Sequence, residues 1–255
     1  MTSLFTARIM LPLLLVFAGL AAGAQTTPKP APEPIQVKFD RCFTAWQTWV
    51  AGQPERALLT IGEEYRDMVD LGPQAAPYLA ERMLAAETPR EGSALAEALA
   101  RVTDKRFPRA QWPVGKYLDP AVRLDLYSRW WQEGRAQTAA DFDRLYARWK
   151  ELKAKGLVFV RDVYVVTYDD EMKTVVPKRD LQRTELADVY DALNDMGIDI
   201  LPLIAEKFAA KDYDLLPIFR DLTHVVPRGR DLDEKVAYCV KWWEANKGEW
   251  IIPMN

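Results

Sequence analysis

The chain repeats a stretch of its own sequence. Residues 61–83 read IGEEYRDMVDLGPQAAPYLAERM and residues 186–208 read LADVYDALNDMGIDILPLIAEKF, and the two align without a gap at an offset of 125 positions, as from 72 to 197. Identical residues at aligned positions include Tyr65 with Tyr190, Gly72 with Gly197, and Pro77 with Pro202. A self-match of this kind indicates a repeat architecture, in which each unit buries its apolar face against its neighbours. The repeat constrains the fold and leaves the activity open.

The repeated stretch predicts two helices joined by a short turn. Apolar residues recur at helical spacing on both sides of the turn, on one face as Leu58, Ile61, Gly62, Tyr65, Met68 and Val69, and on the next as Ala75, Ala76, Leu79, Ala80 and Met83. Gly72 falls just past the first helix, where a left-handed residue is needed, and Pro77 falls in the first turn of the second helix. The second copy places Ile204 where the first has Leu79, so both are predicted core residues.

Two further helices follow in each copy. Residues 94–102 end at Thr103, and residues 215–222 end at Thr223, an offset of 120 positions. Helices over 120–132 and 232–245 each carry a Trp-Trp pair, Trp130-Trp131 and Trp242-Trp243, an offset of 112 positions. One tryptophan of each pair is expected to pack in its own hairpin and the other against the next layer. We therefore expect a first helical lobe over residues 39–155 and a second over residues 180–255.

The turn carries a family resemblance. Leu71–Leu79 (LGPQAAPYL) resembles the LGxxAxPxLxxxL core of bacterial HEAT-like repeats, and Met196–Ile204 is similar, although Ile200 replaces the usual small residue. The resemblance covers about 23 residues strongly in each copy and implies an all-α fold, an armadillo-type α-α superhelix of two duplicated lobes. It implies binding surfaces rather than a particular reaction.

One segment departs from the helical pattern. After Gly156, the residues LVFVRDVYVVTYDDEMKTVVPKR are rich in β-branched and aromatic side chains. They predict a short β-hairpin or an extended insert over residues 156–179, with a turn at Asp169–Glu171. Insertions in repeat proteins lie on one face, often the binding face, so Tyr164, Tyr168 and Met172 are candidate interaction residues. The alternative is a hairpin that only seals the junction between the lobes.

The N-terminus predicts export. Arg8 precedes an apolar run over 9–22, and Ala22-Gly23-Ala24 has the small-x-small pattern of a signal-peptidase site, so residues 1–24 are a predicted signal peptide. The run has about 14 residues, fewer than the roughly 20 needed to span a bilayer, so we expect no membrane span after cleavage rather than an uncleaved anchor. Residues 25–38 form a predicted Pro-rich linker. The protein is expected in the periplasm or outside the cell.

Export permits a disulfide between Cys42 and Cys239. Each cysteine lies on an apolar helical stripe, and the first and last elements of a helical stack lie far apart. We therefore predict that the two cysteines are buried and unpaired.

The residue types argue against catalysis, and we expect no enzyme activity, metal or cofactor. His224 is the single histidine, in the place that Asp104 holds in the first copy, where a helix-capping role is expected. Neither a nucleophile elbow nor a phosphate loop is present, and Asp169-Asp170-Glu171 lacks the spacing of a calcium loop. The acids of the first copy, Glu63, Glu64, Asp67 and Asp70, leave glycan hydrolysis as an alternative.

Basic loops are the remaining candidate surface. The loop after residue 103 carries Lys105, Arg106 and Arg109, and the equivalent loop of the second copy carries Arg228 and Arg230, on a chain of net charge −3. Such loops favour an anion or an acidic partner, and the acidic balance gives no reason to expect nucleic acid. Trp112 is the tryptophan expected to be exposed. We therefore predict an exported scaffold that binds an unknown envelope protein; the alternative is an envelope glycan-binding protein or hydrolase.

Overall fold

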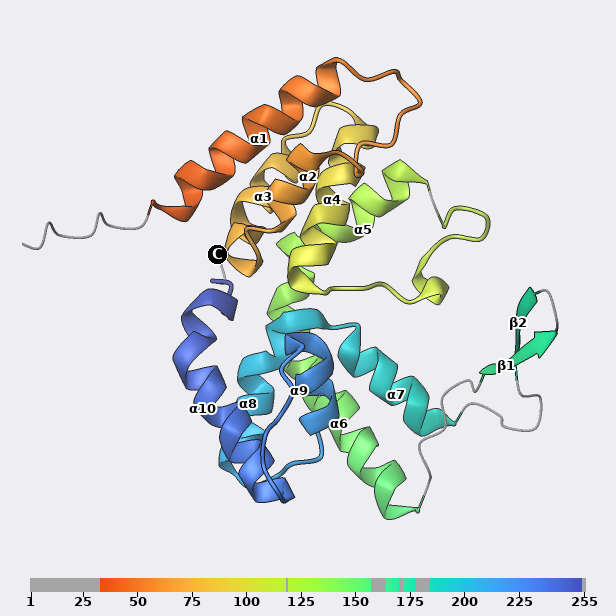
Figure 1. Ribbon diagram of the computed structural model, residues 1–255, viewed down its shortest axis with the longest axis vertical. Helices are drawn as coiled ribbons and strands as arrows, with labels where there is room; N and C mark the ends of the chain where they lie inside the picture. The colour runs from red at the N-terminus through yellow and green to blue at the C-terminus, as the bar shows by residue number, and fades with distance from the viewer. Residues whose placement is uncertain (1–32, 118, 157–163, 170–171, 178–183, 254–255) are drawn as a thin grey trace, which may run out of the picture. The chain divides into compact units, whose positions relative to one another are not determined.

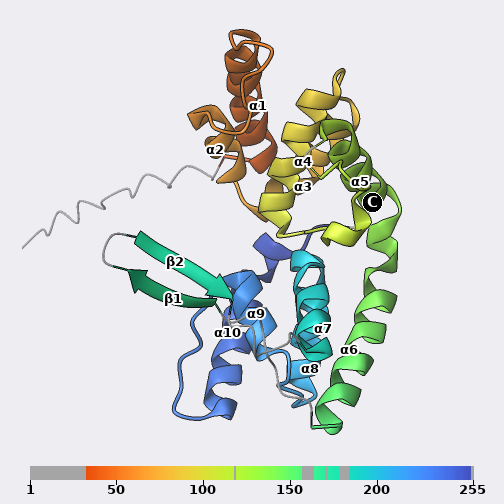
Figure 2. The same cartoon turned by 90° about the vertical axis from the view of Figure 1, so that its right-hand side faces the viewer.

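The computed structural model describes residues 33–117, 119–156, 164–169, 172–177 and 184–253. Most of these residues are helical (Figures 1 and 2). The predicted all-α fold class is confirmed at this level. The predicted signal peptide and most of the predicted linker lie outside the described residues, and residues 33–255 form one compact unit.

The first half of this unit contains six α-helices and three short 3₁₀ turns in its described part. Their bounds are α1 Ile35–Ala51, α2 Glu63–Val69, η1 Pro73–Ala75, α3 Ala76–Leu84, α4 Pro89–Thr103, η2 Arg109–Gln111, α5 Pro120–Gln132, η3 Gly134–Gln137 and α6 Thr138–Ala154. Thr88 begins α4 by accepting a hydrogen bond from the Glu91 amide at 3.2 Å, and Asp119 caps α5 through the Ala121 amide at 3.0 Å. Helices α3, α4 and α5 pack side by side (Figure 1).

The second half contains four α-helices and one short 3₁₀ turn in its described part, in an order that matches α2, η1, α3, α4 and α5 of the first half. Their bounds are α7 Glu185–Asn194, η4 Gly197–Ile200, α8 Leu201–Ala209, α9 Leu216–Thr223 and α10 Leu232–Trp250. Between α6 and α7, β1 (Tyr164–Asp169) pairs antiparallel with β2 (Met172–Pro177), in the register Tyr164 with Pro177 and Asp169 with Met172. Residues 157–163 and 178–183 of the predicted insert lie outside the described residues.

The predicted helix–turn–helix has the same backbone geometry in both copies. Gly72 has φ 72° and directly precedes η1, and Gly197 has φ 74° and is the first residue of η4. Helices α3 and α8 begin and end at positions 125 residues apart, 76–84 and 201–209. The glycine prediction is therefore confirmed, because both positions adopt the left-handed backbone that glycine tolerates best.

The ends of α4 and α9 also match. The Thr103 hydroxyl donates to the Leu99 carbonyl and the Thr223 hydroxyl to the Phe219 carbonyl, both at 2.7 Å. The next residues, Asp104 and His224, both adopt the left-handed conformation that ends a helix. His224 is exposed at this cap, as its position in the repeat predicted.

One detail of the predicted pattern is wrong, and one difference between the copies was not predicted. Helix α2 begins at Glu63, and Leu58 and Ile61 are 67% and 66% exposed in the preceding loop rather than on a buried helical face. The Trp-Trp pairs also differ in phase, because the first copy buries the first tryptophan, Trp130, whereas the second buries the second, Trp243. Corresponding helices therefore present different faces to their neighbours.

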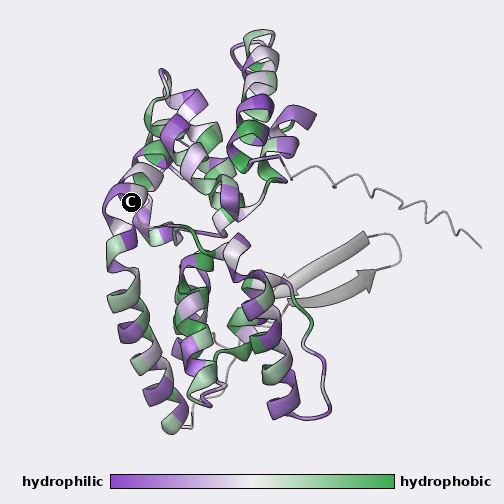
Figure 3. Cartoon of the chain, turned by 90° about the vertical axis from the view of Figure 1, so that its left-hand side faces the viewer, coloured by the Kyte–Doolittle hydropathy of each residue, from purple (hydrophilic) through white to green (hydrophobic). Residues whose placement is uncertain are grey.

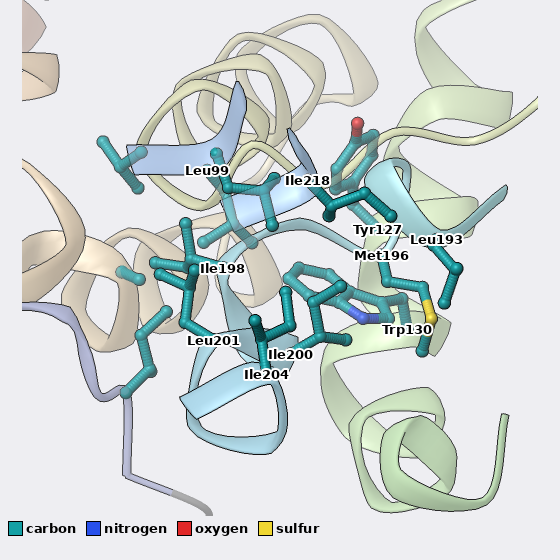
Figure 4. Close-up of a cluster of buried hydrophobic side chains, with 14 of the residues drawn as sticks. Leu99, Tyr127, Trp130, Leu193, Met196, Ile198, Ile200, Leu201, Ile204 and Ile218 are labelled. Carbon is teal, nitrogen blue, oxygen red and sulfur yellow. The ribbon is translucent and has the colours of Figure 1, made fainter. Parts of the chain in front are cut away.

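The core is continuous across the two halves. Leu79 and Ile204 have no exposed surface, so both predicted core positions are confirmed. Figure 4 shows side chains of α4 and α5 meeting those of α7, η4, α8 and α9, with Leu99 and Trp130 close to Ile198, Ile200 and Ile218. Most helices carry both hydrophilic and hydrophobic residues along their length (Figure 3), as expected of helices with one buried face.

A buried ion pair links the halves, and the sequence pattern did not predict it. Arg135 of η3 is 5% exposed and donates from Nε and Nη2 to both carboxylate oxygens of Asp199, at 3.1 and 3.2 Å. It also donates to the carbonyls of Pro253 at 3.1 Å and Ile252 at 2.9 Å. Its guanidinium lies 4.6 Å from the centre of the Trp131 ring. One arginine thus holds the first half, the second half and the C-terminal tail.

Cys42 and Cys239 are both free thiols, as predicted. Cys239 is buried, and burial raises its pKa to about 11, whereas Cys42 is half-buried rather than buried as predicted. Among the described helices, none is both long and apolar enough to cross a membrane.

Candidate functional site

The loop that follows α4 lies against the turn between α7 and α8. The Arg106 amide donates to the Asp195 carbonyl at 3.0 Å, and the Tyr127 hydroxyl donates to the Lys105 carbonyl at 2.8 Å. A Cβ placed on Gly197 would lie 2.4 Å from the Thr103 carbonyl oxygen, so the two backbones approach as closely as a glycine allows. We call this contact, between 103–106 and 195–197, the joint.

Two hollows flank the joint. The larger has a volume of about 630 Å³, apolar walls and a charged rim. The walls are formed by Phe107, Leu126, Trp130, Leu145 and Met196. The rim carries the basic residues Lys105, Arg106, Arg129 and Arg144 and the acidic residues Glu133, Asp141 and Asp195, with smaller and polar neighbours. The smaller, of about 530 Å³, shares Lys105, Arg106, Phe107 and Asp195 with it and adds the aromatic residues Trp112, Tyr117 and Tyr127. Both volumes are in the range of small-molecule and peptide-residue sites.

The arginines of the rim are already paired. Arg106 lies 2.7 Å from Asp104, Arg129 lies 2.6 Å from Asp125, and Arg144 lies 2.9 Å from Asp141, each measured between guanidinium nitrogen and carboxylate oxygen. These pairs are largely exposed, so each adds at most about 1 kcal/mol to stability. They also neutralise most of the positive charge of the rim.

Lys105 differs from these arginines. Its side chain is half-buried between the two hollows, with Nζ 5.1 Å from the centre of the Phe107 ring. Within the described part of the chain, Nζ has no hydrogen bond and no carboxylate within ion-pair distance. Burial lowers the Lys105 pKa, and the carboxylates of Asp195, Asp199 and Asp141 oppose this from farther away. Burial likewise raises the Asp195 pKa.

The structure brings three of the predicted surface residues together. Lys105 and Arg106 line both hollows, and Trp112 lines the smaller one. Trp112 is half-buried rather than exposed as expected, because its indole N–H donates to the Phe107 carbonyl at 3.2 Å and its ring packs 5.2 Å from Tyr117. Arg109 lies farther out on the same loop, 5.8 Å from the Tyr117 ring centre.

The other predicted surface residues do not line these hollows. Arg228 and Arg230 are exposed on the loop before α10, where Arg230 pairs with Glu234 at 2.8 Å. Tyr164, Tyr168 and Met172 lie in the paired strands, and their side chains fall outside the described residues.

Several residues of the hollows were missed from the sequence. Arg129 and Trp130 come from α5, Arg144 from α6 and Met196 from the turn before η4, so Met196 joins the others only because the halves pack together. In the sequence, Trp130 reads as core and Arg129 as a solvated helical charge. The available signal was the density of charge in the loop after Thr103, which pointed to Lys105, Arg106 and Arg109 and to none of these four residues.

The acids of the first copy of the repeated helix lie away from both described hollows. Within the described ranges, no cluster of three or more histidine, cysteine, aspartate or glutamate side chains is arranged to hold a metal ion. Glu63, Glu64 and Asp67 of the repeated helix line neither hollow. No family model, curated protein or solved structure matches this chain.

Proposed function

We propose that the chain is an exported helical-repeat scaffold that binds a protein partner in the periplasm or outside the cell. In this proposal, the two halves are duplicated HEAT-like lobes of an α-α superhelix, and the joint between them is the docking surface. The matching backbone geometry of the glycine turns and helix ends supports the duplication. The resemblance of the turn sequence to HEAT-like repeats supports a binding role.

The joint carries the functional part of the proposal. It combines apolar walls, which give binding energy when they are buried, with charges that orient a partner. Phe107, Trp130 and Met196 supply the walls of the larger hollow. Lys105 is the lining cation that has no carboxylate within ion-pair distance in the described part of the chain. Aromatic residues beside positive charge are typical of the positions that dominate binding energy at protein interfaces.

Glycan binding or hydrolysis is the alternative. The stacked pair of Trp112 and Tyr117 at the edge of the smaller hollow is the observation that favours it. Its support is weaker, because each of the nine tryptophans is buried or half-buried, and the paired acids lie away from both hollows.

Partner capture tests the proposal. The tagged chain is incubated with envelope extract as wild type, as Lys105→Ala/Arg106→Ala, and as the matched control Arg228→Ala/Arg230→Ala, which removes the same charge from the equivalent loop. We expect the first double variant to retain at most a tenth of the captured partner and the control to retain nearly all of it. Equal capture by both variants, at unchanged Tm, would refute a docking role for the joint.

A further inference from the structure

Lys105 is a half-buried cation without a carboxylate partner among the described residues. It lines both hollows, and its ammonium group is half-buried, yet no described acidic group lies within ion-pair distance. The three arginines around the larger hollow each have a carboxylate within 3 Å. A charge that loses water without gaining a partner is unfavourable, so an anion that enters here finds an ammonium that gains by pairing with it.

The surroundings limit the charge of that anion. Asp195, Asp141 and Glu133 line the same hollow, and Asp199 also acts on Lys105. A phosphate or another multivalent anion would be repelled by these carboxylates once the single unpaired cation had been neutralised. The balance therefore favours a ligand with one negative charge.

The walls limit the body of the ligand. Phe107, Leu126, Trp130, Leu145 and Met196 present apolar surface to the hollow, and Figure 4 shows Trp130 and Met196 next to one another. The volume of about 630 Å³ admits a group as large as one or two amino-acid residues. A carboxylate at Lys105 therefore places an attached apolar side chain against these walls.

We propose that the larger hollow binds the carboxylate-bearing, apolar C-terminal residue of a peptide, with its carboxylate paired to the Lys105 ammonium. This inference rests on the proposed scaffold function and names the chemistry of the partner segment. A free C-terminal residue with an apolar side chain carries one negative charge directly beside an apolar group. The charge matches the Lys105 ammonium, and the apolar group matches the walls of the hollow.

The test uses two probes that differ only in charge, N-acetyl-Leu-Phe with a free carboxylate and its C-terminal amide. Each is titrated into the full chain while NMR records the Lys105 side chain and the backbone amides of Lys105, Arg106 and Met196. We expect the free acid to shift these signals and to bind at least tenfold more tightly than the amide, because a hydrogen bond to a charged group is stronger than a neutral one. Inorganic phosphate should not displace the acid.

Variants locate the contact. Lys105→Met keeps the apolar stem and should weaken binding of the acid at least tenfold, Lys105→Arg should restore it to within a few-fold of wild type, and Arg228→Ala should leave it unchanged. Equal binding of acid and amide by the wild type would overturn the inference without any variant. Tighter binding of phosphate, or signals that move only around Arg228, would also overturn it.

The pH dependence gives an independent readout. The probe carboxylate is ionised above about pH 4, and only the protonated Lys105 attracts it. Affinity should therefore be highest below the Lys105 pKa and fall as pH rises through that pKa, which burial places below the ordinary value. Charged or titratable groups around Lys105 include Arg106 on its loop, Asp104 at the end of α4, Tyr127 on α5, Asp141 on α6, Asp195 at the end of α7 and Asp199 in η4. An affinity that stays constant up to pH 11 would contradict the assignment.

Probe binding and partner capture together distinguish a wrong carboxylate site from a wrong scaffold function. If the probe does not bind while partner capture still depends on Lys105 and Arg106, the carboxylate inference is wrong and the scaffold function stands. If the probe binds at Lys105 and no protein is captured, the hollow is a carboxylate site and the scaffold function is wrong.

Discussion

Arg135→Met is expected to lower the free energy of unfolding by about 3–5 kcal/mol, because it removes one member of a buried ion pair. The substitution strands the Asp199 carboxylate, which is 10% exposed, and leaves the carbonyls of Ile252 and Pro253 without their donor. Urea denaturation followed by circular dichroism measures the loss.

A matched control separates the loss of a buried ion pair from the loss of an exposed one. Arg129→Met removes an arginine from an exposed pair with Asp125 and should cost less than about 1 kcal/mol. The double variant Arg135→Met/Asp199→Leu should recover part of the loss, since it no longer buries an unpaired carboxylate. A loss below about 1 kcal/mol for Arg135→Met alone would show that this pair does not hold the halves together in solution.

Gly197→Ala is the second large effect that the structure predicts. The new Cβ would lie 2.4 Å from the Thr103 carbonyl oxygen and 2.8 Å from the Lys105 amide nitrogen, both backbone atoms that cannot rotate away. The left-handed backbone adds its own cost for any residue with a Cβ. We expect a total loss of about 2–5 kcal/mol in the free energy of unfolding, measured by urea denaturation.

The repeat itself supplies the control. Gly72 has nearly the same φ, but a Cβ placed there meets no atom within 4 Å. Its ψ is −162°, so its backbone lies in a region that is essentially restricted to glycine, and Gly72→Ala should show only that backbone cost, about 1–3 kcal/mol. The difference between the two variants measures the packing of the joint, and equal losses would mean that 103–106 does not lie against Gly197.

The helical turns were predictable because their signals are local. Gly72 and Gly197 adopt the backbone that glycine tolerates best, and Leu79 and Ile204 are buried as their spacing indicated. Spacing alone could not place the start of α2, since the run from Leu58 continues the helical period through Gly62, directly after a segment that holds Gly52 and Pro54. Helix breakers there outweigh the apolar pattern, and the apolar side chains remain exposed.

The site was predictable only in part, because its residues depend on tertiary packing. Lys105 and Arg106 stand out as clustered charges in a loop. The pairing of Arg135 with Asp199 joins residues 64 positions apart, and no local pattern connects them. Trp130 and Met196 appear in the sequence as ordinary core residues, and their second role, as walls of a hollow, arises from the way the two halves meet.

Site-specific photo-crosslinking tests the central claim, that a protein partner docks at the joint. A photo-reactive phenylalanine analogue replaces Gln137, an exposed residue that lines the larger hollow, or Arg228 as the control position, in the full chain exposed to envelope extract. We expect a discrete crosslinked protein from Gln137, lost on Lys105→Ala/Arg106→Ala, and little or none from Arg228. Crosslinking from Arg228 alone, or from Gln137 without dependence on Lys105 and Arg106, would contradict it.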